Sequence, residues 1–107
     1  MQVTILGLKS CDTCRKARKA LPDAEFRDIR DDPLDAGEIE QLLAEFGDKL
    51  VNRASTTWRS LNEAARSEDP AALLAAHPAL MKRPVFLGEK GNLLGWSAQT
   101  RAALGIG

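Results

Sequence analysis

Residues 3–29 constrain the fold most, because they alternate between a strand, a helix and a second strand. Val3–Leu8 is a short apolar run with β-branched residues, which is typical of a buried strand. Asp12–Leu21 predicts a helix that ends before Pro22, and Glu25–Ile29 alternates apolar and polar residues as a strand does. A strand–helix–strand unit crosses over right-handed, so we expect the two strands to be parallel.

The next part of the chain predicts helices. Asp35 and Glu38 have the spacing of a capping box, and apolar residues then recur at helical spacing as far as Gly47. No strand pattern occurs in residues 48–77. Here we expect a loop over Leu50–Thr57, a short helix over residues 58–65, and a helix over residues 71–76 with Asp69 as its N-cap and Pro70 at its first position.

The last part predicts a hairpin and a helix. Pro84–Leu87 and Leu93–Gly95 are short strand patterns, and the glycine-containing turn over Gly88–Asn92 requires them to be antiparallel. Ser97 begins a final helix through about Leu104. The order predicts an α/β protein with a thioredoxin-like fold: a four-stranded mixed sheet flanked by helices, with a helical insertion before the third strand. We expect one domain over residues 1–107, with the insertion at about residues 48–80.

Composition and charge exclude several other classes. With 107 residues the chain is long enough for one core, and its 44% hydrophobic residues are typical of globular proteins. Fifteen Lys and Arg balance fifteen Asp and Glu, so we expect neither nucleic acid nor an anionic membrane as a partner. No apolar run approaches the ~20 residues that cross a bilayer, and the apolar start lacks the pattern of a signal peptide. We therefore expect a cytoplasmic protein.

The two cysteines form a C-x-x-C motif, Cys11-Asp12-Thr13-Cys14, between the first strand and the first helix. Free N–H groups and the positive end of the dipole at a helix N-terminus favour an anion such as a thiolate. We expect Cys11 to be the exposed nucleophile. Cys14, one turn further, is then expected to lie beneath it and to resolve a mixed disulfide.

Other interpretations of the motif remain open. The cysteines could be half of a zinc site, although only His77 remains as a further soft ligand, and we expect no metal. They could also be buried and inert. A phosphatase loop of the form C-x5-R is excluded, because Ala17 stands where the arginine would be.

Two arginines stand out further along the chain. Arg83 precedes Pro84, and an X-Pro bond adopts the cis form far more readily than other peptide bonds. A cis proline beside the reactive cysteine is a known feature of thioredoxin-like folds. Arg53 is the second candidate, since a guanidinium presents a donor fork suited to carboxylates and oxyanions.

The distribution of charge supports an anionic ligand. Residues 9–19 contain five basic residues and a single acid, Asp12, whereas ten acids lie in residues 23–48. The basic segment coincides with the proposed thiolate, so we expect a small anion or anionic thiol as the substrate.

Several motifs together resemble the arsenate reductase (ArsC)-like family, most closely its YffB-type branch, which is related to the Spx regulators. The resemblance covers essentially the whole chain. Its motifs are the segment Gly7–Ala17 with the C-x-x-C, Asn52-Arg53 with Thr56-Thr57-Trp58-Arg59, the segment His77–Pro84, and Leu93-Leu94-Gly95-Trp96-Ser97.

The resemblance implies a role for each motif. In arsenate reductases of this family a nucleophilic cysteine attacks arsenate, and glutathione and glutaredoxin resolve the adduct; Cys11 corresponds to that cysteine. Two of three oxyanion-binding arginines correspond to Arg53 and Arg83, whereas Trp96 occupies the place of the third. This departure favours a thiol over arsenate. Within the same motifs, the candidate substrate-binding residues also include Lys9, Thr13, Arg59 and Pro84.

The sequence thus predicts an enzyme: a thiol–disulfide oxidoreductase or ArsC-family reductase that uses glutathione as co-substrate and has no bound cofactor. Its expected partners are glutathione or another small anionic thiol or oxyanion, and glutaredoxin, and we expect a monomer. The alternative is a Spx-like redox-sensing regulator that binds RNA polymerase. Spx regulators carry a C-x-x-C at this place, but they extend further beyond the last helix than this chain, which stops at Gly107.

Overall fold

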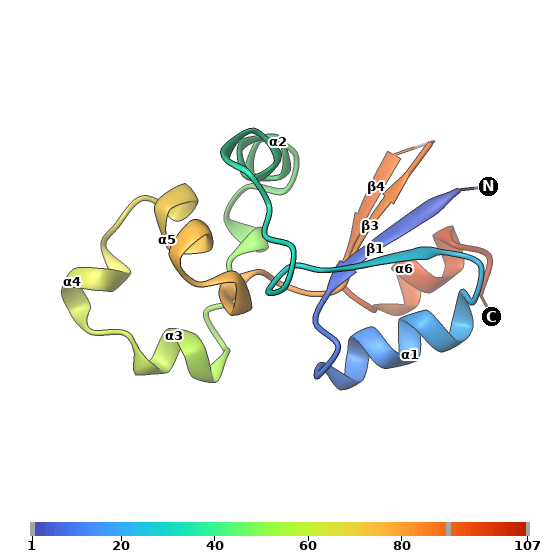
Figure 1. The fold of residues 1–107 in the computed structure, drawn as a ribbon, viewed down its shortest axis with the longest axis horizontal. Coiled ribbons are helices and arrows are strands. Elements are labelled where there is room, and N and C mark those ends of the chain that lie inside the picture. Colours follow the sequence, from blue (N-terminus) through green and yellow to red (C-terminus); the bar gives the residue numbers. More distant parts are fainter. Residues whose placement is uncertain (1, 90, 107) are drawn as a thin grey trace. The chain divides into compact units, whose positions relative to one another are not determined.

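The computed structural model describes residues 2–89 and 91–106, so the outermost residues of the expected domain and position 90 of the expected turn lie outside the described residues. The elements follow in the order β1 (Val3–Gly7), α1 (Asp12–Ala20), β2 (Glu25–Asp28), α2 (Ala36–Phe46), η1 (Gly47–Leu50), α3 (Thr56–Ser60), α4 (Glu63–Arg66), α5 (Pro70–Ala76), η2 (Pro78–Leu80), β3 (Val85–Gly88), β4 (Gly91–Leu94) and α6 (Ala98–Ala103) (Figure 1). They form two compact units, of which one contains the sheet with α1 and α6 and the other spans Arg30–Lys82.

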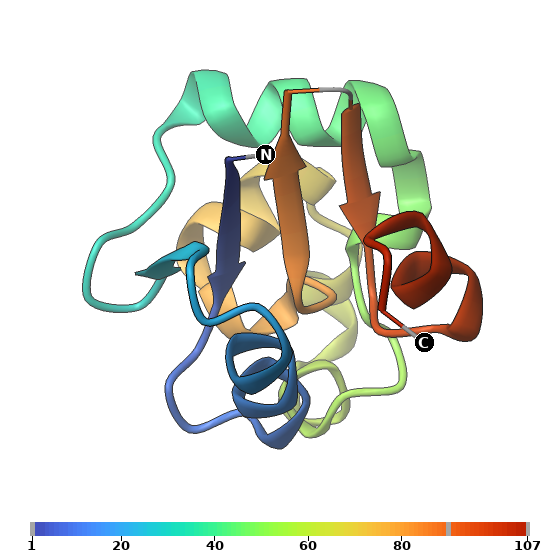
Figure 2. The same ribbon diagram turned by 90° about the vertical axis from the view of Figure 1, so that its right-hand side faces the viewer.

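The sheet unit has four strands in the order β2-β1-β3-β4. β1 pairs with β2 in parallel, with Ile5 opposite Phe26, as the predicted crossover requires. β1 pairs with β3 in the antiparallel sense, and β3 and β4 form the predicted antiparallel hairpin. The helices α1 and α6 lie on the same face of this sheet (Figure 2). The mixed four-stranded sheet with helices is confirmed.

The core of this unit lies between the sheet and its two helices. Ile5 on β1, Ala17 on α1 and Phe86 on β3 are at most 1% exposed and form one cluster. The ring of Trp96 stacks on Phe86, with ring centroids 5.9 Å apart. Burying a side chain as large as Ile5 or Phe86 stabilises the fold by about 1.5–3 kcal/mol, so this cluster anchors α1 against β1.

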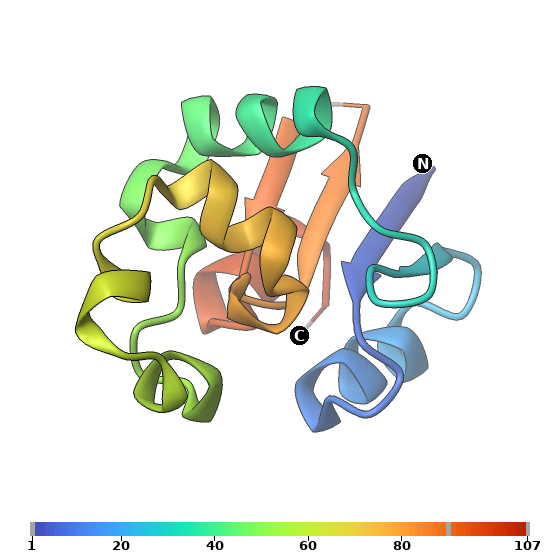
Figure 3. The ribbon, with the colours of Figure 1, turned by 60° about the vertical axis from the view of Figure 1, so that its left-hand side comes forward.

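The second unit is built from helices. α2 begins with the predicted capping box, in which the Glu38 N–H donates to the Asp35 carboxylate at 2.8 Å and the Asp35 N–H donates to Glu38 at 3.0 Å. α2 packs against α5 (Figure 3). Val51 and Met81 pair in an antiparallel bridge, which brings together the two ends of the segment 51–81.

Two expectations for local structure are wrong. Residues 58–65 form two helices rather than one, because Ser55 caps α3, Leu61 is extended, and Asn62 caps α4. The last strand is Gly91–Leu94 rather than Leu93–Gly95, because Gly95 has a φ of 86°, which a strand does not accommodate.

The division into one domain with an insertion at about residues 48–80 stays a prediction; these residues fall within the second unit. Within the described part of the chain, each helix is too short or too polar to cross a membrane.

Candidate active site

Cys11 occupies the N-cap position of α1, on the loop that follows β1. Its N–H donates to the carbonyl of Leu8 at 3.1 Å, which turns the chain, and its own carbonyl accepts the Arg15 N–H at 3.0 Å, the first bond of the helix. Its backbone is extended, with φ of −85° and ψ of 122°. The thiol therefore lies at the positive end of α1, as the C-x-x-C motif predicts.

The surroundings of Cys11 favour its thiolate. Partial burial raises the pKa of Cys11, but polar contacts with the backbone and thiol of Cys14, together with a hydrogen bond and the positive charge of Arg83, outweigh this effect and hold the pKa below its ordinary value of 9.0. Cys11 is partly exposed, so a thiolate there is accessible to a substrate.

Cys14 has the opposite character. It is 0% exposed, and burial with the neighbouring Cys11 raises its pKa to about 11. Both cysteines are reduced. One thiol is therefore accessible and acidic, and the other is buried and protonated at neutral pH.

The close approach of β1 to Cys14 requires a glycine. A Cβ at Gly7 would collide with the Cys14 Sγ and lie 3.2 Å from its Cβ. Gly7 thus leaves the space in which the second sulfur sits. No such role was predicted for Gly7 from the sequence. The prediction that Cys14 lies beneath Cys11, at the junction of the first strand and the first helix, is the signal that could have found it.

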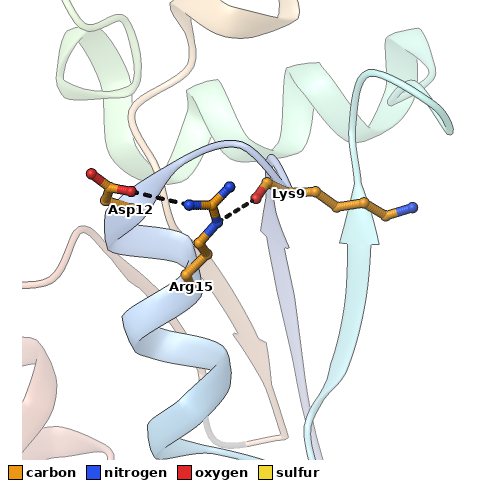
Figure 4. A network of polar contacts seen from close by, with 3 residues as sticks. All are labelled: Lys9, Asp12 and Arg15. Atoms are coloured by element: carbon orange, nitrogen blue, oxygen red, sulfur yellow. Dashed lines mark hydrogen bonds and ion pairs between the residues drawn. The ribbon is translucent and has the colours of Figure 1, made fainter.

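Polar contacts hold the loop that carries Cys11. The Lys9 N–H donates to the Asp28 carboxylate at 2.9 Å, which ties the loop to the end of β2. The Arg15 Nε donates to the Lys9 carbonyl at 3.0 Å, and its Nη1 pairs with Asp12 at 3.4 Å (Figure 4). Sequence reasoning missed Asp28 and Arg15 as loop supports. Asp28 is the last residue of β2 and lies opposite Gly7 in the pairing of β2 with β1, so its contact with the loop follows from strand register rather than from a local motif.

Arg83 and Pro84 stand at the start of β3 in the same unit. The Arg83–Pro84 peptide bond is cis, the Pro84 side chain is buried, and the Pro84 carbonyl accepts the Gly95 N–H at 2.8 Å. The structure therefore brings Arg83 beside Cys11 and Cys14, and Pro84 follows Arg83 directly in the chain. Lys9 lies on the supporting loop, and Thr13 lies half-buried in the first turn of α1.

The other two predicted arginines belong to the second unit. The Arg53 guanidinium contacts Asp48 through its carbonyl at 3.4 Å and its carboxylate at 3.9 Å, and lies 5.3 Å from the centre of the Trp58 ring. Arg59 donates to the carbonyl of Ala54 at 2.9 Å. Their part in a site with Cys11 stays a prediction.

Among residues 2–89 and 91–106, no three His, Cys, Asp or Glu side chains are grouped so that they could hold a metal ion.

Comparisons with known proteins agree with this architecture. The chain is 33% identical to the YFFB protein, and the two structures superpose with a TM-score of 0.84. The match covers 94% of this chain and 96% of the YFFB chain. It is 38% identical to an arsenate reductase (ArsC) related protein from Brucella melitensis, with a TM-score of 0.75 over 99% of this chain and 97% of the other. It is also 34% identical to the global transcriptional regulator Spx of Bacillus subtilis, over 89% of this chain and 80% of that protein.

The family comparison covers nearly the whole chain. The sequence model of the ArsC family matches residues 6–104, a range that includes both cysteines and Arg83-Pro84. With its thioredoxin-like sheet and this match, the chain belongs to the ArsC family.

Proposed function

We propose that the protein is a thiol–disulfide oxidoreductase in which the Cys11 thiolate is the nucleophile and glutathione is the reductant. The observation that carries the proposal is the acidic, accessible Cys11 at the N-terminus of α1, next to Arg83 and above a buried thiol. A thiolate, rather than a thiol, attacks disulfides, so a lowered pKa at an exposed position increases the reactive fraction at neutral pH.

The reaction divides into two exchanges. The Cys11 thiolate attacks one sulfur of a substrate disulfide, forming a mixed disulfide and releasing the other sulfur as a thiolate. Cys14, after losing its proton to solvent, attacks the Cys11 Sγ and releases the second substrate thiol. Two glutathione molecules then reduce the Cys11–Cys14 disulfide and become oxidised glutathione, so the two electrons given to the substrate are replaced. Alternatively, one glutathione attacks the Cys11 Sγ of the mixed disulfide and releases the second substrate thiol, and a second glutathione then releases the Cys11 thiolate and forms oxidised glutathione.

The basic side chains suit an anionic substrate. Arg83 lies beside Cys11 and can stabilise both the thiolate and a carboxylate or oxyanion at the reacting sulfur. Arg53, Arg59, Lys9 and Thr13 are proposed to contribute further substrate contacts. Trp96, which stands where the family resemblance implies a third arginine, packs on Phe86 instead, and this favours a thiol over arsenate. We further propose that the protein acts as a cytoplasmic monomer and that glutaredoxin is an additional electron donor.

Mass spectrometry after treatment with oxidised glutathione tests this function. Cys14→Ser is expected to accumulate one glutathionyl group on Cys11. The unsubstituted protein is expected to pass through that adduct to an internal disulfide, and Cys11→Ser, the matched control, is expected to form neither. If the unsubstituted protein forms neither species, Cys11 is not the nucleophile.

A redox-sensing regulator is the second candidate, favoured by the 34% identity with Spx of Bacillus subtilis. Under this proposal the Cys11–Cys14 pair would control binding to RNA polymerase. A pull-down with purified RNA polymerase, under reducing and oxidising conditions, distinguishes the candidates. Recovery in one redox state alone supports the regulator, whereas no recovery in either state eliminates it.

A further inference from the structure

A groove with a strongly basic lining lies in the sheet unit. It has a volume of about 710 Å³ and is lined by Lys9, Arg15, Arg18 and Lys19 together with apolar side chains that include Leu21 and Phe26. Its lining contains no acidic residue. We refer to it as the basic groove.

The sequence of α1 explains the lining. Arg15, Arg18 and Lys19 are spaced three and four residues apart, so their side chains project from one face of the helix. Lys16 does not line the groove. All three groove-lining cations of α1 are exposed.

Aromatic packing orders part of this surface. The Arg18 guanidinium lies 4.3 Å from the centre of the Phe26 ring, within the range of a cation–π contact. This contact holds the Arg18 guanidinium against the apolar side of the groove. The guanidinium also covers one face of the Phe26 ring.

The basic groove adjoins the reactive loop. Lys9 precedes Cys11 by two residues, and Arg15 holds the Lys9 carbonyl (Figure 4). In Figure 4 the Lys9 side chain extends away from the Arg15 guanidinium. A ligand in the groove would therefore be tethered near the loop that carries the nucleophile.

We propose that the basic groove docks an acidic segment of a protein whose disulfide is reduced at Cys11. This rests on the proposed oxidoreductase function and names its substrate class. Carboxylates of Asp and Glu complement the four cations, and arginine binds them in a defined geometry. The groove carries four cations and no acidic lining residue, and Arg15 also contacts Asp12 at 3.4 Å. A segment with several carboxylates complements this charge better than one glutathione, which has two.

The other anionic macromolecule, nucleic acid, fits less well. Arg18 covers a face of Phe26, so this ring is a poor platform for base stacking. Fifteen acidic residues also bring the net charge of the chain to zero, which removes the overall attraction for a long polyanion.

The proposal is tested with a matched pair of activated peptides. Each contains one cysteine as a mixed disulfide with 2-thiopyridine, flanked in one peptide by Glu and in the other by Gln, and attack by Cys11 releases 2-thiopyridone, which is followed by its absorbance. At low salt the Glu peptide is expected to react about tenfold faster with the unsubstituted protein, since electrostatic complementarity mainly raises the association rate. The advantage is expected to shrink as salt is added.

Variants with equal charge changes locate the effect. Arg18→Gln/Lys19→Gln is expected to lose most of the preference for Glu, yet to react with the Gln peptide at the original rate. Lys16→Gln/Lys49→Gln removes the same charge outside the basic groove and is expected to keep the preference. Equal rates for the two peptides, or equal losses in the two variants, overturn the proposal.

A binding measurement separates docking from chemistry. A fluorescent Glu peptide without cysteine is expected to bind Cys11→Ser, as followed by anisotropy, and to bind more weakly when Arg18→Gln/Lys19→Gln is added. If this peptide binds but no disulfide is reduced, the oxidoreductase proposal fails and docking stands. Equally tight binding of an oligonucleotide of the same charge overturns the choice of an acidic peptide. If the protein self-associates and Arg18→Gln/Lys19→Gln abolishes this self-association, the choice of an acidic peptide is also overturned. The occupant of the basic groove would then be a second copy of the chain.

Discussion

At the scale of single residues, the two cysteines differ through their surroundings. Cys11 is accessible, and Arg83 and Cys14 stabilise its thiolate; Cys14 is fully buried, and burial keeps it protonated. The same residue type at two positions three apart thereby acquires opposite acidities, which suit the two roles proposed above, attack by Cys11 and resolution by Cys14.

The role of Arg83 can be measured by the alkylation rate of Cys11 as a function of pH. The inflection is expected below pH 9.0, and Arg83→Gln is expected to move it upward, because removing a nearby positive charge destabilises the thiolate. Each unit of increase lowers the thiolate fraction about tenfold at pH values well below the pKa. Cys14 is expected to react only as the pH approaches about 11.

Lys82→Gln is the matched control for this experiment, since it removes the charge of the preceding, exposed residue. Its alkylation profile is expected to follow that of the unsubstituted protein. If Arg83→Gln leaves the pH of the inflection unchanged, Arg83 does not affect the pKa of Cys11.

A second prediction concerns the space beside Cys14. Gly7→Ala places a Cβ against the Cys14 Sγ, and such overpacking typically destabilises a core by about 1–3 kcal/mol. Chemical denaturation measures this loss in the free energy of unfolding. In a Cys14→Ala background the colliding sulfur is absent, so the loss is expected to be smaller, and the difference gives the coupling between the two positions.

Gly37→Ala provides the contrast. Gly37 lies in α2, where an added Cβ would meet only the Asp35 carboxylate at an ordinary 3.4 Å. Alanine is favoured over glycine in helices, so this variant is expected to gain about 0.4–1 kcal/mol. A Gly7→Ala variant as stable as the unsubstituted protein would mean that β1 and α1 can separate freely.

Sequence patterns predicted the thiol pair and Arg83 because each belongs to a short, recognisable motif. They did not predict the role of Gly7, which arises from the packing of α1 against β1, or that of Asp28, which arises from strand pairing. Asp28 reaches the Lys9 N–H only because β2 runs parallel to β1 with Gly7 opposite Asp28. A contact of this kind depends on register, which no local pattern of residues specifies.

At the scale of secondary structure, the N-termini of α2 and α5 show which predicted N-caps form side-chain hydrogen bonds. The Asp35–Glu38 pair forms the predicted reciprocal box. Asp69 stands at the N-cap of α5 as predicted, yet its side chain makes no capping hydrogen bond. Pro70 follows it at the first helical position and lacks an N–H, so the first turn of α5 has one unpaired donor fewer.

The two caps predict different mutational effects. Asp35→Ala removes an acceptor that holds the first turn of α2 and is expected to destabilise the protein by about 1 kcal/mol. Asp69→Ala, the same change at the other N-cap, is expected to alter the free energy of unfolding by less than about 0.5 kcal/mol. Urea denaturation compares them, and equal losses for the two variants would contradict this account.

The division of residues 58–65 into α3 and α4 was missed because both helices are short. Ser55 caps α3 and Asn62 caps α4, but Ser55 fell in the expected loop over Leu50–Thr57 and Asn62 fell inside the single helix expected over residues 58–65. Segments of five and four residues have almost no apolar periodicity, so hydrophobic spacing cannot detect them.

At the scale of the whole molecule, the order of the strands follows from long-range pairing. The sequence predicted the parallel unit and the hairpin, which are local, but gave no basis for joining β3 to β1. The contact between these strands links segments far apart in the chain, and it places both at the centre of the sheet.

Hydrogen exchange is expected to reflect this arrangement. The amides of the inner strands β1 and β3 should exchange most slowly, whereas those of α3 and α4, which have no buried residues, should exchange fastest among the helices. Residue-resolved exchange by NMR measures the difference. Protection in α3 equal to that of Ile5 would contradict it.

The pairing of β1 with β3 also has a consequence for the order in which the protein is made. A ribosome produces the Cys11 segment before Arg83 and β3, and domains assemble as units during synthesis. Until then the nascent thiol lacks the guanidinium that acidifies it, and Cys14 lacks the finished sheet that shields it. The lowered pKa of Cys11 and the burial of Cys14 therefore depend on the completed fold. An unfinished chain exposes two cysteines with ordinary thiol acidity.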